Sequence, residues 1–167
     1  MTELREIVPG MIRTGTQTVH QDWIDYNGHM NVAYYTMAFD RALDEVFDDW
    51  LGVGADQAKE LRMGPMALQS QIHYLDELKL GDTFACDFQM LDADPKKIHF
   101  FTTMINLVSG AEAATYESLS MNVDLNARRS APYPAPARAR IEALLAAQAD
   151  LPRPARAGAR IGIRRKG

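Results

Sequence analysis

Four side chains with acid, amide and imidazole groups occur within seven residues of this chain. Asp25, Asn27, His29 and Asn31 alternate with other residues in the segment DYNGHMN, directly before a stretch with helical spacing. The first turn of a helix offers unpaired N–H groups and the positive end of the helix dipole, which can polarise a carbonyl oxygen as charge develops on it. A carboxylate just upstream could attack that carbonyl or activate a water against it. These are the parts needed for acyl transfer or hydrolysis.

The same residues also have a purely conformational interpretation. Asn27-Gly28 is a strong turn signal because both residues tolerate positive φ, and Asn31 is a good N-cap for the helix that follows. Short motifs often match by chance. Read alone, the segment therefore leaves a turn followed by a cap as the alternative to a catalytic site.

A long helix is expected directly after this segment, over about residues 32–51. Apolar residues recur there with i, i+3, i+4, i+7 spacing, and Gly52 ends the pattern. The first two turns, residues 32–39, carry no charged side chain. This pattern predicts that the start of the helix is buried by other parts of the protein.

The period changes to two after about residue 65, which indicates strands. The expected strands are residues 66–75, 83–91, 97–108 and 113–123, and a short strand-like run covers residues 11–19. Short links carrying turn signals join the four later strands, which predicts an antiparallel meander. The resulting class is α+β, with one long central helix wrapped by a curved antiparallel sheet of about five strands.

Length and composition narrow the class further. The chain has 167 residues, which fits a single domain, and one cysteine, Cys86, which excludes an intrachain disulfide and a Cys/His zinc framework. No uncharged run exceeds 14 residues, and the N-terminus has no apolar signal core, so we expect no membrane segment. The net charge of -4 argues against a nucleic-acid partner. A reducing, cytoplasmic setting is expected.

The end of the chain differs in composition from the rest. Residues 126–167 hold 10 of the 18 Lys and Arg residues, a Pro-rich connector and a short helix expected over residues 138–149. We therefore divide the chain into a main domain, residues 1–125, and a basic Pro/Ala/Arg-rich extension, residues 126–167. The extension is expected to pack on the same domain or on a neighbouring subunit.

The order of these features resembles a known family. A strand, then Asp-x-Asn-Gly-His-Met-Asn, then a long helix with an early Tyr-Tyr and four antiparallel strands resembles the hot-dog fold, and within it the acyl-CoA thioesterases of the 4-hydroxybenzoyl-CoA thioesterase type. Residues 72–82 (IHYLDELKLGD) resemble that family's second strand and its Gly-Asp turn. Residues 97–99 (KIH), 114–117 (ATYE) and 151–154 (LPRP) resemble bacterial betainyl-CoA thioesterases of carnitine breakdown.

The resemblance implies roles for the residues of the motif. Asp25 corresponds to the family's nucleophile or general base, and the backbone N–H groups of Asn31 and Val32 would bind the thioester oxygen. Asn27 and His29 match an Asp-x-Asn-x-His pattern of related acyl-ACP thioesterases, in which both are implicated in catalysis. The 4-hydroxybenzoyl-CoA enzymes lack these two residues, so their duties here stay open.

The resemblance also implies the ligands and the assembly. The substrate would be an acyl-CoA, with no separate cofactor because coenzyme A is part of the substrate, and with no metal. The protein would form a homodimer or homotetramer with the site at the subunit interface. The expected substrate-binding residues, whose aromatic members could form a wall for a cationic acyl group, are Trp23, Tyr26, Tyr34, Tyr35 and Met66. Ordinary packing is the alternative for each aromatic residue.

Two further questions stay open from the sequence. Arg128 and Arg129 follow the last expected strand and could bind the coenzyme A phosphates, although solvated surface arginines are an equal alternative. Other activities of the fold also compete with thioester hydrolysis. A hydratase resembles Asp-x-Asn-x-x-His, with its histidine five residues past the aspartate, whereas His29 is four past Asp25. A non-catalytic acyl or CoA-binding module is the third possibility.

Overall fold

A computed structural model describes residues 3–163 and 165 of the chain. Its central element is helix α1, Val32–Val46, which continues into a π-helical segment, η2, Phe47–Leu51. Gly52 ends the helix in the left-handed conformation, with φ of 65°. The side chain of Asn31 caps the other end by accepting a hydrogen bond from Ala33 N at 3.0 Å. The predicted helix over residues 32–51 is therefore confirmed, including both of its end signals.

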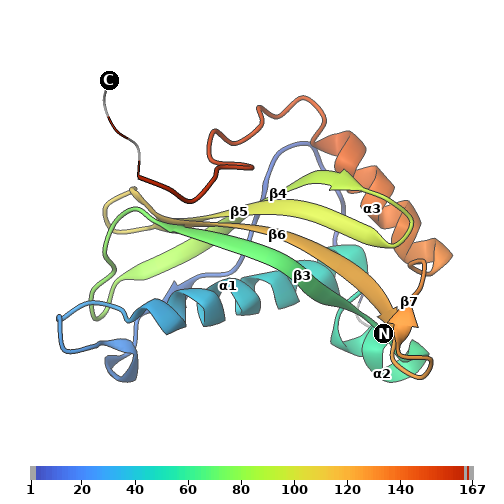
Figure 1. Ribbon diagram of the computed structural model, residues 1–167, viewed down its shortest axis with the longest axis horizontal. Helices are drawn as coiled ribbons and strands as arrows, with labels where there is room; N and C mark the ends of the chain where they lie inside the picture. Colours follow the sequence, from blue (N-terminus) through green and yellow to red (C-terminus); the bar gives the residue numbers. More distant parts are fainter. Residues whose placement is uncertain (1–2, 164, 166–167) are drawn as a thin grey trace.

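A curved antiparallel sheet wraps around this helix (Figure 1). Four long strands make up most of it: β3, Met63–Tyr74; β4, Thr83–Ala93; β5, Lys97–Asn106; and β6, Glu112–Asp124. Three two-residue strands complete it: β1, Ile12–Arg13; β2, Gln17–Thr18; and β7, Arg129–Ser130. The fold is the hot-dog fold, as predicted, with seven strands rather than about five.

The strand order corrects one prediction. The sheet runs β1-β4-β5-β6-β3, so β3 pairs with β6 and not with β4. Only β4, β5 and β6 form a meander, and the expected meander of four strands is wrong. The link from β3 to β4, residues 75–82, crosses from one side of the sheet to the other past the start of α1 (Figure 1). A short link predicts a hairpin on local grounds, and its crossing depends on contacts distant in sequence.

The core forms where the apolar face of α1 meets the sheet. Phe39 stacks on Tyr116 of β6 at a centroid distance of 5.2 Å, and Phe47 meets Phe100 of β5 edge-on at 5.9 Å. Aromatic pairs of this geometry add to the stabilisation from burial alone. Phe39 and Phe100 are completely buried. The helix is thus fixed along its length, which also fixes the position of its N-terminus.

Two further helices lie outside the layer formed by α1 and the layer formed by the sheet. Helix α2, Ala55–Leu61, was not predicted, and α3, Ala135–Ala147, begins three residues before its predicted start. The side chain of Gln148, directly after α3, accepts from Met90 N at 2.7 Å and donates to Gly10 O at 2.9 Å. Ile141 and Leu144 of α3 belong to the same hydrophobic core as α1. Helix α3 and Gln148 therefore pack on the body of their own chain.

The segment after α3 returns over the outer face of the sheet (Figure 1). Gly158 N donates to Glu117 Oε2 at 2.7 Å, and Arg156 pairs with Glu112 at 3.2 Å. Both carboxylates belong to β6, so this segment is held on the face opposite to α1. None of the helices within the described residues is both long and apolar enough to cross a bilayer.

Candidate active site

The segment before α1 is closed into a tight loop by its own backbone. Ile24 and Met30 form an isolated antiparallel bridge, and Asp25 N donates to His29 O at 3.0 Å. Gly28 N donates back to Asp25 O at 3.0 Å, and Gly28 has φ of 81°, which a residue with a side chain rarely adopts. The turn predicted at Asn27-Gly28 is confirmed. This closure places the side chain of Asp25 next to the start of the helix.

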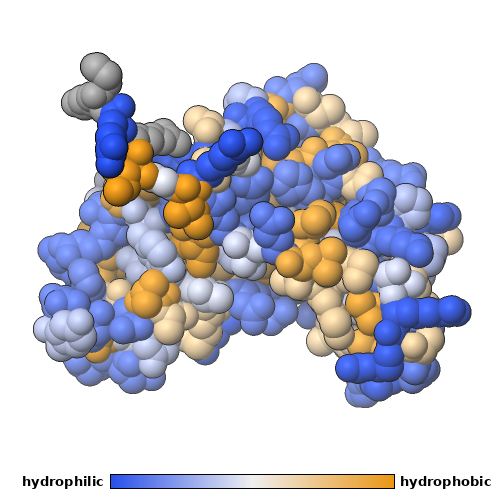
Figure 2. All heavy atoms as spheres, viewed as in Figure 1, coloured by the Kyte–Doolittle hydropathy of each residue, from blue (hydrophilic) through white to orange (hydrophobic). Residues whose placement is uncertain are grey.

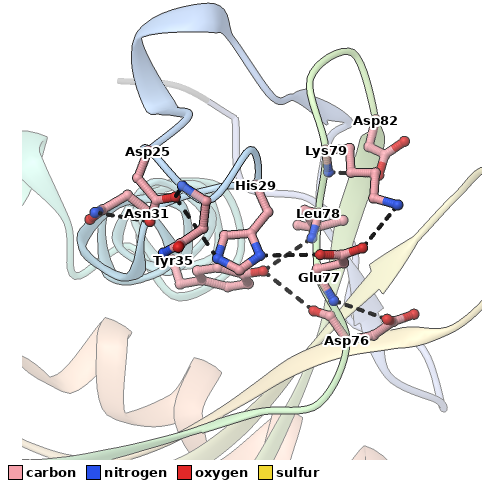
Figure 3. A network of polar contacts seen from close by, with 10 residues as sticks. Asp25, His29, Asn31, Tyr35, Asp76, Glu77, Leu78, Lys79 and Asp82 are labelled. Atoms are coloured by element: carbon pink, nitrogen blue, oxygen red, sulfur yellow. Dashed lines mark hydrogen bonds and ion pairs between the residues drawn. The ribbon is translucent and has the colours of Figure 1, made fainter.

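The carboxylate of Asp25 is held by two contacts from the same segment. Oδ1 accepts from Asn27 N at 2.8 Å, and Oδ2 faces Asn31 Nδ2 at 3.4 Å (Figure 3). Because Asn31 Oδ1 caps the helix, one asparagine both ends the loop and orients the acid. The Asp25 side chain is 14% exposed. It is therefore positioned firmly but stays reachable from solvent.

The first turn of the helix contains one available amide. Asn31 N donates to Trp23 O at 2.8 Å, so this N–H is already used within the chain. Among the described residues, none accepts a hydrogen bond from Val32 N, and Val32 is exposed. Of the two amides expected to bind a thioester oxygen, the one at Val32 is free to do so.

The ring of His29 lies between two carboxylates. Its Nε2 is 3.9 Å from Asp25 Oδ1, and its Nδ1 is 3.1 Å from Glu77 Oε2 (Figure 3). The other oxygen of Glu77 pairs with Lys79 Nζ at 2.9 Å. The hydrogen bond from Lys79, followed by the one to His29, lowers the pKa of the Glu77 carboxyl. Sequence reasoning missed Glu77, because no local pattern connects it to a histidine 48 residues earlier.

Tyr35 holds the segment that carries Glu77 in place. Its hydroxyl donates to Asp76 O at 3.3 Å and accepts from Leu78 N at 3.2 Å (Figure 3). Met30 N donates to Leu78 O at 2.7 Å, and Leu78 is fully buried. Burial raises the pKa of the Tyr35 phenol, which keeps it protonated and able to donate. Tyr35, expected to bind substrate, has its hydroxyl occupied beneath this loop.

The other expected aromatic contacts do not gather into one wall. Trp23 is 3% exposed, stacks on Tyr34 at 5.5 Å and has the guanidinium of Arg41 5.4 Å from its ring. Tyr26 is 96% exposed at the tip of the loop. Trp23 thus supports the loop from beneath, while Tyr26 points into solvent.

Three expected ligand contacts lie away from Asp25 in the single chain. Met66 is on the edge strand β3 and is 43% exposed. Arg128, which has φ of 56°, ends the turn between β6 and β7, and Arg129 begins β7. Strand β7 lies at the opposite end of the molecule from the start of α1 (Figure 1). One chain alone does not bring these residues to the carboxylate.

Clefts in the single chain also lie elsewhere. Two clefts of about 550 and 650 Å³ open between residues 155–162 and strands β3 and β6. Neither includes Asp25. The carboxylate of Asp25 therefore lies outside both of these clefts.

Comparison with known proteins places the chain in a family. Residues 19–147 match the model of the Thioesterase-like superfamily. The chain belongs to this superfamily. The matched region runs from the start of the Asp25 loop to the end of α3, so it contains the whole of this site.

Relatives of this thioesterase-like protein carry more specific names. A betainyl-CoA thioesterase from Pseudomonas aeruginosa is 30% identical over 153 residues, which is 92% of this chain and 96% of that protein. An L-carnitine dehydrogenase/betainyl-CoA thioesterase from Rhizobium meliloti is 33% identical over 157 residues, 93% of this chain. The chain spans only 31% of the length of that two-activity relative.

A solved structure supports the same grouping. A hypothetical protein from Staphylococcus aureus, determined in complex with CoA, superposes with a TM-score of 0.86 at 28% identity. The match covers 96% of this chain and 99% of that one. The architecture of the two chains is therefore shared from end to end.

Proposed function

We propose that this thioesterase-like protein hydrolyses an acyl-CoA thioester to the free acid and coenzyme A, with Asp25 as the reacting carboxylate. The observation that carries the proposal is the position of Asp25. Its carboxylate is fixed by Asn27 N–H and by the amide of Asn31, beside the open N–H of Val32 at the start of α1. An acid beside an unpaired helix amide is the arrangement that thioester cleavage requires.

The chemistry follows from these positions. The thioester oxygen accepts a hydrogen bond from Val32 N–H, where the helix dipole stabilises the negative charge that develops on it. Asp25 either takes a proton from a water that attacks the carbonyl carbon or attacks that carbon itself, forming a mixed anhydride that water then cleaves. The C–S bond breaks and coenzyme A leaves as a thiolate. His29 Nε2, 3.9 Å from Asp25 Oδ1, can hold the same water.

The charge around the site favours a cationic acyl group. Asp25, Asp76 and Glu77 lie together beside the start of α1, with Lys79 as the paired cation. Surplus negative charge attracts a quaternary ammonium group and repels a carboxylate. Together with the relatives named betainyl-CoA thioesterase, this supports betainyl-CoA as the substrate and a role in carnitine metabolism. For the location of the protein we propose the cytoplasm.

The free edge of the sheet supports a homodimer. Strand β3 is 12 residues long and ends the sheet order, and its five middle residues, 66–70, are all exposed. They include Met66 at 43% and Leu68 at 51% exposed, and Figure 2 shows apolar side chains gathered over this strand. A long, apolar edge strand is an aggregation hazard unless another strand covers it. A second copy, paired antiparallel along β3, covers it symmetrically.

Such a dimer would complete the site. Met63 of β3 pairs with Asp124, just before the turn that carries Arg128 and Arg129, while Tyr74 ends β3 near Asp76. Antiparallel pairing puts the Met63 end of one β3 beside the Tyr74 end of the other. The partner's Arg128 and the partner's Arg129 would then approach Asp25. In this arrangement the two arginines would bind the coenzyme A phosphates, because guanidinium groups match phosphate geometry.

Release of free thiol from an acyl-CoA tests the proposed activity. Purified protein is mixed with betainyl-CoA and the thiol is followed with a chromogenic disulfide. Asp25→Asn should lower kcat by at least about 10², since a reacting group contributes more than a single oxyanion donor. Asp22→Asn, which removes the same charge from an exposed residue of the 3-10 turn Gln21–Trp23, should leave kcat unchanged.

The same assay separates the competing activities. A binding module takes up acyl-CoA and releases no thiol, and a hydratase changes an enoyl-CoA without releasing thiol. Wild-type kcat in Asp25→Asn would refute the assignment of Asp25. Betainyl-CoA is compared with 3,3-dimethylbutanoyl-CoA, in which carbon replaces the quaternary nitrogen. Equal kcat/KM for the two would refute the selection for positive charge.

A further inference from the structure

We infer that Glu77, on the link between β3 and β4, is a positioning residue that orients the ring of His29 toward Asp25. The inference rests on the proposed function, because orientation of His29 matters only if the Asp25 loop performs chemistry. It adds to the site a residue from a segment distant in sequence.

Both oxygens of the Glu77 carboxylate have a partner. Glu77 Oε2 lies 3.1 Å from His29 Nδ1, while Oε1 lies 2.9 Å from Lys79 Nζ. Lys79 therefore fixes the rotation of the carboxylate, so that one oxygen faces the imidazole. The His29 and Glu77 side chains are 37% and 48% exposed, so neither group needs the other to neutralise a buried charge. An exposed ion pair contributes little to stability.

Several hydrogen bonds hold the backbone around Glu77. Glu77 N donates to Asp76 Oδ1 at 2.9 Å, and Lys79 N donates to Asp82 Oδ2 at 2.9 Å. Between them, Leu78 is completely buried and is bonded through its N–H to Tyr35. The link is therefore anchored on both sides of residue 77, and the carboxylate keeps its distance from the ring.

The consequence is a defined orientation of the imidazole. With Nδ1–H donating to Glu77, the lone pair of the neutral ring is on Nε2, the nitrogen that faces Asp25. A water between Nε2 and Asp25 Oδ1 can then donate one proton to each acceptor. The charged groups that face the ring are Asp25 from its own loop and Glu77 from the link, with Lys79 behind Glu77 and Asp76 beside it.

A second histidine–glutamate pair in the same chain provides a matched control. His99 Nε2 lies 2.8 Å from Glu117 Oε1 on the outer face of the sheet, where Glu117 also accepts from Gly158 N. The chemistry of the two pairs is alike, but the second lies on the face opposite to α1. Glu117→Gln should therefore leave kcat unchanged.

The test uses the full chain, the thiol-release assay and four variants of the pair. Glu77→Ala should lower kcat about tenfold with little change in KM, as expected for lost orientation of an acid–base group. His29→Ala should lower kcat further, and the double variant should equal His29→Ala within about twofold, because Glu77 acts through the ring. Glu77→Asp, which keeps a carboxylate as the acceptor, should recover part of the lost kcat.

Several results would overturn the inference. One is wild-type kcat in Glu77→Ala. Another is a full additional tenfold loss when Glu77→Ala is added to His29→Ala, which would mean that Glu77 acts independently of His29. Unfolding midpoints within about 2 °C of wild type show that the variants fold. A wild-type protein that releases no thiol would refute the proposed function instead, and the two failures are thereby distinct.

Discussion

Replacement of Tyr35 by phenylalanine separates two roles for a residue at the start of α1. If Tyr35 were a substrate contact, Tyr35→Phe would alter KM and leave stability unchanged. Its hydroxyl instead joins Asp76 O and Leu78 N, both on the link between β3 and β4. We therefore expect the loss of one oxygen to destabilise the fold and to loosen the segment that carries Glu77.

The expected size follows from these two hydrogen bonds. Tyr35 is 5% exposed and Leu78 is fully buried, so the freed Leu78 N–H has no access to water. A hydrogen bond contributes about 1 kcal/mol net, and a buried donor left unpaired costs about 1–3 kcal/mol. The unpaired Leu78 N–H is the larger of these two costs, and we expect a loss of about 2 kcal/mol in the free energy of unfolding. For a chain of this size that corresponds to a fall of about 4–8 °C in Tm.

Urea unfolding and thermal melts at a fixed protein concentration measure this change. Tyr26→Phe is the matched control, because that hydroxyl is on a side chain 96% exposed and should leave Tm unchanged. The kcat of Tyr35→Phe should fall, because Glu77 loses its fixed distance from His29. An unchanged Tm together with a raised KM would refute the anchoring role and assign Tyr35 to substrate binding.

Three further predictions concern the loop, the far end of the sheet and the buried thiol. Asn31→Ala should cost about 1 kcal/mol of stability and reduce kcat, whereas Asn31→Ser, which still caps the helix, should recover stability only. Replacing Arg128 and Arg129 together by alanine should raise KM about tenfold for an acyl-CoA and spare a pantetheine thioester that lacks the phosphates; an equal rise for both refutes phosphate binding. Burial raises the pKa of Cys86 to about 12, so the native protein should not react with the thiol reagent, and the unfolded chain should react once. Because the native fold favours the protonated thiol, its contribution to stability should be complete below about pH 9 and be lost as pH rises toward about 12, which Cys86→Ala should abolish.

Local signals predicted the part of the site that is contiguous in sequence. The turn at Asn27-Gly28, the cap at Asn31 and the end of the helix at Gly52 each depend on backbone preferences of single residues. These preferences act within a few residues, so one sequence reveals them. The same reasoning placed Asp25 beside the start of the helix, which is where the carboxylate lies.

Those local signals do not predict which segments distant in sequence pair with each other. The alternation of residues 66–75 indicated a strand, but alternation says nothing about its neighbour, and β3 pairs with β6 rather than β4. The contact between Glu77 and His29 was missed for the same reason. The aromatic residues show that local sequence also does not predict burial. Trp23 and Tyr26 are both aromatic and lie in the same segment, yet Trp23 is 3% exposed and Tyr26 is 96% exposed.

The unpredicted crossover is also what brings Glu77 to the Asp25 loop. A hairpin between β3 and β4 would leave residues 75–82 at the edge of the sheet, away from α1. Because the link instead passes the start of the helix, Leu78 is buried there, and Met30 and Tyr35 bind its backbone. Glu77, next to Leu78, is thereby held against His29. The burial that stabilises the crossover and the orientation of the histidine are thus consequences of the same contacts, which is why Tyr35→Phe should affect both.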